Sequence, residues 1–305
     1  MRRSVGEAPA VLSPDALLAI PTGLEAMAEI TKVEVQRRVK RREILKEMDL
    51  SGLNFEESNL DGGDFRKCKL EGSTFNGVPM SYTRFEACNL SRCEMRNTSL
   101  RESAIIECDL SDTNMQDSDL SEANLRNCTL VRTNLSGCRL VQSVMLDVKG
   151  HLSNFSQAVL HNVLLGGAKL QICDFSACDA KELLAENADF SGSHFTGSHL
   201  QASLLTGAIL NFCDLTAASL EECKLGNASL FAATLHHARF NTTDLTSSQL
   251  VHAQGSEVLF QDATLDNANL SFADFTGSNF NGAGLSGIYE HETVFEGASF
   301  EGATR

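Results

Sequence analysis

Large apolar residues recur at every fifth position along most of the chain. Among the residue numbers divisible by five from Leu50 to Phe300, 46 of 51 are Leu, Phe, Met or Ile. The five exceptions are Gly150, Ala180, Ala185, Gly255 and Glu290. Two residues before each of these positions, the chain almost always has a small or β-branched residue. The phase never shifts, so no insertion interrupts the repeat.

A five-residue period matches neither the 3.6-residue period of an α-helix nor the two-residue period of a strand. The chain must therefore turn once per pentapeptide, with one large and one small side chain pointing inward and the other three residues facing water. A single unit cannot bury its own inward face, so successive turns must stack into a solenoid.

Three segments show the unit most clearly: 123–127 (Ala-Asn-Leu-Arg-Asn), 188–192 (Ala-Asp-Phe-Ser-Gly) and 268–272 (Ala-Asn-Leu-Ser-Phe). The sequence resembles the pentapeptide-repeat family, whose pattern is A(D/N)LXX, over roughly residues 49–303. The resemblance implies an all-β solenoid, a right-handed, four-sided parallel β-helix with four pentapeptides, or twenty residues, in each coil. At a strand spacing of ~4.8 Å, about twelve to thirteen coils would form a rod on the order of 60 Å long.

All ten cysteines fall at the small inward position. They are Cys68, Cys88, Cys93, Cys108, Cys128, Cys138, Cys173, Cys178, Cys213 and Cys223. Their spacings follow from the repeat, which argues against a metal site and in favour of core packing. Stacked backbones lie within disulfide range, but parallel Cα–Cβ bonds give poor bridge geometry. We therefore expect free thiols, as in a reducing cytoplasm.

The same twenty-residue folding stacks phenylalanines in columns. The columns are Phe55 with Phe75, Phe155 with Phe175 and Phe195, and Phe240 with Phe260, Phe280 and Phe300. Aromatic columns in this register indicate a packed core rather than a cofactor site. No cofactor is expected.

Residues 1–48 lack the repeat, which divides the chain into an N-terminal helical segment, 1–48, and a β-helix, 49–305. Ser13 followed by Pro14 predicts an N-cap and the first position of a short helix that ends at Ile20.

Thr22 and Glu25 have the spacing of a capping box and predict a long helix that continues to about Met48. We expect this helix to cover the first coil, whose open end would otherwise expose unpaired backbone groups. Its second half contains a basic run: Arg37, Arg38, Lys40, Arg41 and Arg42. The run predicts either a solvated face paired with neighbouring Glu residues or a docking site for an acidic partner or anionic lipid.

Charge and hydropathy restrict the function further. The 305 residues include 40 acidic and 25 basic side chains, for a net charge of −15, so direct binding to nucleic acid is not expected. No run approaches the ~18 apolar residues of a membrane helix, and the short apolar run between Pro14 and Pro21 does not suffice for a signal peptide. We expect a cytoplasmic protein, or one secreted without a cleaved signal peptide.

Patterns that suggest chemistry are by-products of the repeat. Residues 282–287 spell G-x-G-x-x-G, but they lie in repeat register without a following helix, so a dinucleotide site is not expected. The eight histidines occupy outward positions and do not form a column, which argues against a metal site. A filled solenoid has no cleft, so we expect no enzyme unless the interruptions at Gly150, 180–185, Gly255 or Glu290 open a pocket.

An apolar ridge is one candidate partner site. At the position just before the large inward residue, where the pattern expects Asn or Asp, apolar residues repeat at intervals of twenty. The ridge consists of Val144, Leu164, Leu184 and Leu204, with Leu146 on the same side. Such a ridge would be roughly 15 Å long, and contiguous exposed apolar surface usually marks an interface. The alternatives are that the N-terminal helix covers it, or that Lys181–Asn187 forms a protruding loop.

An acidic patch is the second candidate. Its members are Glu102, Glu107, Asp109, Asp112, Asp117, Asp119 and Glu122. Resemblance to the gyrase-protecting quinolone-resistance members of the family implies an acidic rod that imitates duplex DNA. The simpler alternative is solubility. Arginines interrupt the acidic field, and the C-terminal helix that joins those relatives into dimers is missing from this sequence.

Together these features predict a non-enzymatic protein–protein interaction rod or adaptor. It is similar to bacterial pentapeptide-repeat proteins, some of which are injected effectors. The alternative is a DNA mimic that binds gyrase or another topoisomerase. The expected partner is another protein, and an uncapped C-terminal coil predicts self-association.

Overall fold

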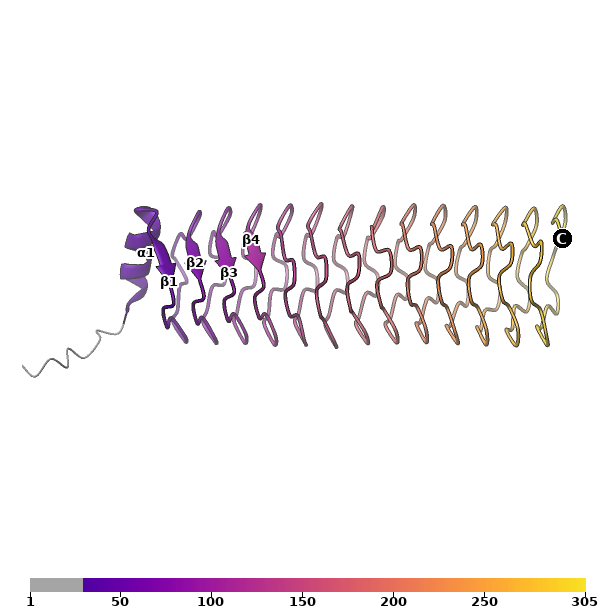
Figure 1. Ribbon diagram of the computed structural model, residues 1–305, viewed down its shortest axis with the longest axis horizontal. Coiled ribbons are helices and arrows are strands. Elements are labelled where there is room, and N and C mark those ends of the chain that lie inside the picture. The colour runs from indigo at the N-terminus through magenta and orange to yellow at the C-terminus, as the bar shows by residue number, and fades with distance from the viewer. Residues whose placement is uncertain (1–29) are drawn as a thin grey trace, which may run out of the picture. The chain divides into compact units, whose positions relative to one another are not determined.

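The solenoid is built from twenty-residue coils that pair in parallel. The computed structural model describes residues 30–305, and residues 31–305 form one compact unit. Helix α1 (Lys32–Lys40) precedes the strands β1 (Ile44–Lys46), β2 (Asp64–Arg66), β3 (Arg84–Glu86) and β4 (Ala104–Ile106). The strands form one parallel sheet in the order β1-β2-β3-β4 with a register of twenty residues. Parallel bridges continue this register to the pair Gly284 and Thr304, so the coils stack regularly along one axis (Figure 1).

Each pentapeptide turns the chain through one corner. The residue two places after the large inward residue has a positive φ, as at Asp112 (60°) and Gly137 (65°), and this left-handed conformation bends the backbone. The amide of the next residue donates to the carbonyl of the large residue, as from Thr113 to Leu110 (3.1 Å). One turn per five residues is thus confirmed.

The inward positions form a buried core as far as Leu285, and those of the last coil are half-buried or exposed. Leu125, Cys108 and Phe175 are all buried, as the pattern predicts. Within the phenylalanine columns, the Phe155 and Phe175 rings stack with centroids 4.7 Å apart, and Phe175 and Phe195 stack at 4.8 Å. The other predicted columns also form, including Phe280 over Phe300 at 5.1 Å.

The small inward position also satisfies backbone acceptors. The carbonyl oxygen of Leu110 accepts the turn hydrogen bond from Thr113 and a second one from the Thr133 hydroxyl (2.8 Å) one coil later. Cys93 donates in the same way to the carbonyl of Leu70 (3.0 Å). This explains why Cys, Ser and Thr are frequent here: each combines small volume with a hydrogen-bond donor.

Neighbouring side chains fill the interruptions at Gly150 and Gly255, whereas Glu290 is exposed in the last coil. A Cβ atom on Gly150 would lie 2.8 Å from Leu170, and one on Gly255 would lie 2.7 Å from Val258. Ala180 and Ala185 are buried on either side of Leu183, which takes the small position but supplies a large side chain. The alternative of a protruding loop at Lys181–Asn187 is therefore wrong, because this segment keeps the regular coil geometry.

The helix ends earlier than the sequence predicts. Its N-cap is Thr31, and it stops at Lys40 because Arg42 adopts a left-handed φ of 57°. Leu45 then enters the core beneath Phe65. The predicted helix to Met48 is wrong in this part, and the first coil includes residues assigned to the helical segment 1–48. The predicted helix over residues 13–20 and the capping box at Thr22 and Glu25 lie outside the described residues.

Helix α1 covers the first coil, as expected. Val35 and Val39 are buried against it, and a Cβ atom on Gly63 would lie 3.3 Å from Val39. The Lys32 ammonium also donates to the carbonyl of Glu56 (3.3 Å).

Candidate interaction surface

The apolar ridge forms one continuous column on one face. Val144, Leu164, Leu184 and Leu204 are joined in sequence by parallel bridges, and all four are half-buried. Leu146 is half-buried beside the column. The column is bounded by Asn124 at one end and Lys224 at the other. Four successive coils therefore present aliphatic side chains where their neighbours present polar ones.

Helix α1 does not cover this ridge. Its contacts are with the first coils, at β1, Glu56 and Gly63. The ridge starts at Val144, on the coil that follows Asn124. Among the described residues, no helix covers the ridge, and its side chains stay half-buried.

The seven acidic residues do not gather on one face. Glu102 and Glu122 share one corner, whereas Glu107, Asp112 and Asp117 lie at the other three corners of the coil. Several of the carboxylates in this patch are paired. Arg132 binds Asp112 at 2.6 Å, and Arg101 binds Asp119 (3.2 Å) and Glu122 (3.5 Å). The Arg132 guanidinium lowers the pKa of Asp112. The patch is therefore a partly neutralised ring.

The basic run is largely paired within α1. Arg37 and Arg38 both bind Glu34, and Arg41 lies 3.8 Å from Glu43. The hydrogen bond from Arg38 lowers the pKa of Glu34. Lys40 and Arg42 make no ion pair with any described residue.

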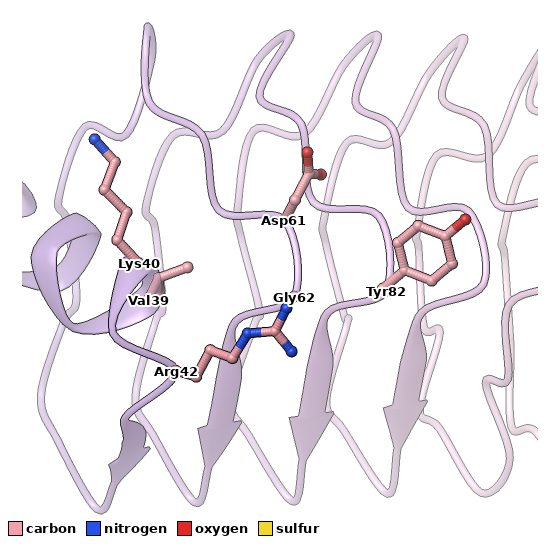
Figure 2. A pocket seen from close by; sticks show the side chains of 6 residues that line it. All are labelled: Val39, Lys40, Arg42, Asp61, Gly62 and Tyr82. Atoms are coloured by element: carbon pink, nitrogen blue, oxygen red, sulfur yellow. The ribbon is translucent and has the colours of Figure 1, made fainter.

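Lys40 and Arg42 line a surface groove beside the first coils, together with Val39, Asp61, Gly62 and Tyr82 (Figure 2). Arg42 extends toward Gly62, whereas Lys40 extends in another direction. The Asp61 carboxylate is already engaged, because it accepts hydrogen bonds from the amide of Ser81 (2.8 Å) and from Asn59 (3.2 Å). Within the basic run, Lys40 and Arg42 are thus the two side chains that could bind an acidic group of a partner.

The histidines point outward, and among residues 30–305 no cluster could hold a metal ion. Gly282 and Gly287 of the G-x-G-x-x-G segment have positive φ values at two corners of the coil. Within the described part of the chain, no helix is long and apolar enough to cross a membrane.

The ten cysteines are free and buried. Burial raises the pKa of the Cys93 and Cys223 thiols to about 12. Because the thiolate is the nucleophile, both burial and the raised pKa suppress reaction.

We expect a maleimide at neutral pH to leave nearly all ten thiols unmodified in the folded protein, and to modify all of them in denaturant. Intact-mass spectrometry over time measures this difference. Modification of several thiols within minutes under native conditions would contradict the inward placement.

An exposed row of aromatic rings was missed by the sequence analysis. On one corner of the coils, Phe212 contacts Phe231, Phe231 contacts His252, His252 stacks on Phe272, and Phe272 contacts His291. The centroid distances lie between 5.1 and 5.6 Å. We call these five residues the aromatic corner. Folding the outward positions at twenty residues could have found it, because the members are 19, 21, 20 and 19 residues apart.

Coils of twenty residues, with four corners and parallel pairing throughout, define a right-handed four-sided β-helix, so the predicted fold is confirmed. The chain belongs to the pentapeptide-repeat family. The model of the pentapeptide repeat region matches residues 48–125 and 213–289, and the model of eight pentapeptide repeats matches residues 108–145, 173–211 and 186–221.

Several solved structures of pentapeptide-repeat proteins are similar to the chain. HetL, a pentapeptide repeat protein involved in heterocyst differentiation regulation from the cyanobacterium Nostoc sp. strain PCC 7120, is 22% identical, with a TM-score of 0.26 over 90% of this chain and 96% of its own. QnrB1, a plasmid-mediated fluoroquinolone resistance protein, is 17% identical, with a TM-score of 0.40 over 61% and 85% of the two chains. Rfr23 from the cyanobacterium Cyanothece 51142 is 20% identical, with a TM-score of 0.32 over 43% and 90%. No curated protein matches the sequence significantly.

Proposed function

We propose that this protein is a non-enzymatic interaction rod that binds another protein through the apolar ridge. The observation that carries the proposal is the uninterrupted column from Val144 to Leu204, half-buried on four successive coils. The backbone beneath it is rigid, because each coil is hydrogen-bonded to the next. A rigid platform reduces the entropy lost on binding.

The chemistry of the ridge favours an aliphatic or aromatic partner surface. Beside the column, Leu146 adds apolar area and packs over Gly166, where a Cβ would lie 3.4 Å from the Leu146 side chain. An apolar side chain from a partner protein can pack on Leu146 and Leu164 together. Burial of apolar area would then supply the binding free energy.

A DNA mimic is less well supported. Such a protein needs continuous negative charge, whereas three of the seven acids in the candidate patch are paired with Arg101 or Arg132. The remaining acids are distributed around the coil rather than along one face.

Replacing Leu164 by Asp should abolish partner capture with little loss of thermal stability, because the new carboxylate stays half-exposed in the middle of the ridge. The matched control is Val159→Asp. Val159 is also half-buried and sits at the same position of its pentapeptide, but its column neighbours are Arg139 and Asp179.

The measurement is affinity capture from lysate of the source organism with the unaltered protein and both variants, followed by quantitative mass spectrometry. A protein lost with Leu164→Asp and kept with Val159→Asp supports the ridge. Equal recovery with both variants contradicts it, as does failure of Leu164→Asp to fold, since the side chain would then be internal.

A further inference from the structure

The aromatic corner continues a longer apolar edge. Its column begins with Leu152 and Ile172, passes Gly192 and then reaches Phe212. Leu152 and Ile172 are each 49% exposed, and Phe212 is 62% exposed. No side chain among the described residues covers these groups. Eight coils thus present aliphatic residues at one end of the edge and aromatic rings at the other.

The aromatic half of this edge lacks fixed charge. Three outward columns form it: one from Ile209 to Tyr289, one from Asn211 to His291, and one from Phe212 to Phe272. These columns contain no Asp, Glu, Lys or Arg, although the chain has 40 acidic and 25 basic residues. Two copies that each carry a net charge of −15 repel each other over most of their surfaces. The aromatic half of the edge adds no charge to this repulsion.

We propose that the edge binds a second copy of this chain, with the two solenoids side by side and antiparallel. This goes beyond the proposed function, because the edge lies on a different face from the ridge. A two-fold axis between the coils of Phe212 and Ala232 makes the edge self-complementary. It places Phe212 opposite Ala232 of the second copy, and His252 opposite Gly192 of the second copy.

The same symmetry brings the aliphatic half of one copy onto the aromatic half of the other. Ile172 lies opposite Phe272 of the second copy, which brings an exposed aliphatic side chain onto an exposed aromatic ring. At each end, Leu152 lies opposite Glu292 of the second copy, and the uncharged contact stops there. An isologous interface requires such self-complementarity.

The predicted dimer is weak. Eight coils at ~4.8 Å span about 34 Å, and a strip of one corner would bury on the order of 1,000 Å² in total, at the low end for specific interfaces. We therefore expect a dimer that dissociates on dilution in the micromolar range.

Phe212→Asp tests the interface by placing a carboxylate beside its two-fold axis. The matched control is Tyr82→Asp, since Tyr82 is 64% exposed and has the same positive φ on another corner. In sedimentation velocity over a concentration series, we expect Phe212→Asp to raise the dimer dissociation constant at least about tenfold and Tyr82→Asp to leave it unchanged. The proposal is overturned if the unaltered protein stays monomeric. It is also overturned if Phe212→Asp leaves the dimer unchanged, which is the result expected for an interface at the last coil.

Cross-linking tests the antiparallel arrangement. The native thiols are buried, so a short bis-maleimide reports only an added cysteine. Ala232→Cys lies near the axis and should give covalent dimers, whereas Leu152→Cys should give none, because the two Leu152 positions would be about 34 Å apart. Dimers from both variants would show a parallel pair, and dimers from neither would show no contact here. Either result refutes the arrangement, whether or not the ridge binds its partner.

Discussion

Replacing Phe175 by Ala should lower the free energy of unfolding by about 4 kcal/mol, near the upper part of the range for deleting a buried ring. The Phe175 ring stacks on Phe155 and Phe195 and meets the edge of Phe190 at 5.6 Å. Removing it leaves a cavity that the neighbours cannot close, because each coil is held to the next by backbone hydrogen bonds.

The measurement is urea unfolding followed by circular dichroism. Tyr82→Ala is the control, since it removes an aromatic ring that is 64% exposed and should change stability by less than about 0.5 kcal/mol. Equal losses of unfolding free energy for the two variants would contradict the assignment of Phe175 to a core column that stabilises the solenoid. Because stability in a solenoid is a sum over neighbouring repeats, the variant should also broaden the transition by weakening the coils around residues 155–195.

The β-helix is predictable from sequence because its core contacts join residues at fixed intervals of the repeat. Leu125 is buried for the same reason as every large residue at a multiple of five: the unit turns once and always presents the same two positions to the core. The twenty-residue coil then fixes contacts such as Phe155 with Phe175, without any need to predict distant topology.

The end of α1 could not be predicted in this way, because two patterns compete in the same segment. Val35, Val39 and Leu45 are compatible with helical spacing, but Leu45 also falls on the five-residue phase. In the structure Leu45 takes the core position beneath Phe65, and the left-handed conformation of Arg42 ends the helix before it. Sequence periodicity alone does not tell whether extending the helix or placing Leu45 in the core gives the lower free energy.

The two surface features differ in how visible they are in the sequence. The ridge lies in one column at strict intervals of twenty, so Val144 and Leu164 reveal it directly. The residues of the aromatic corner belong to two adjacent columns. Their rings meet only because the turn of the coil places Phe231 between Phe212 and His252. Finding it requires the corner geometry as well as the repeat length.

Replacing Val35 by Asp should detach the N-terminal cover of the solenoid and cost about 3 kcal/mol or more, because a buried carboxylate would lack a partner. Val35 has no exposed surface and packs where α1 meets the first coil. Val33→Asp is the matched control: Val33 is 67% exposed on the same helix, and a carboxylate in the first turn favours the helix dipole.

Hydrogen exchange should show where the loss occurs. With Val35→Asp, the amides of α1, β1 and β2 should exchange faster, because an uncovered coil retains only one neighbour, while amides near Leu210 keep their protection. The exposed edge of β1 should also promote association at higher protein concentration. If both variants exchange alike, or if protection falls uniformly along the solenoid, the helix does not act as a local cap. A loss confined to the first coils instead shows that the solenoid depends on α1 only at its N-terminal end, since each coil is stabilised chiefly by the coils beside it.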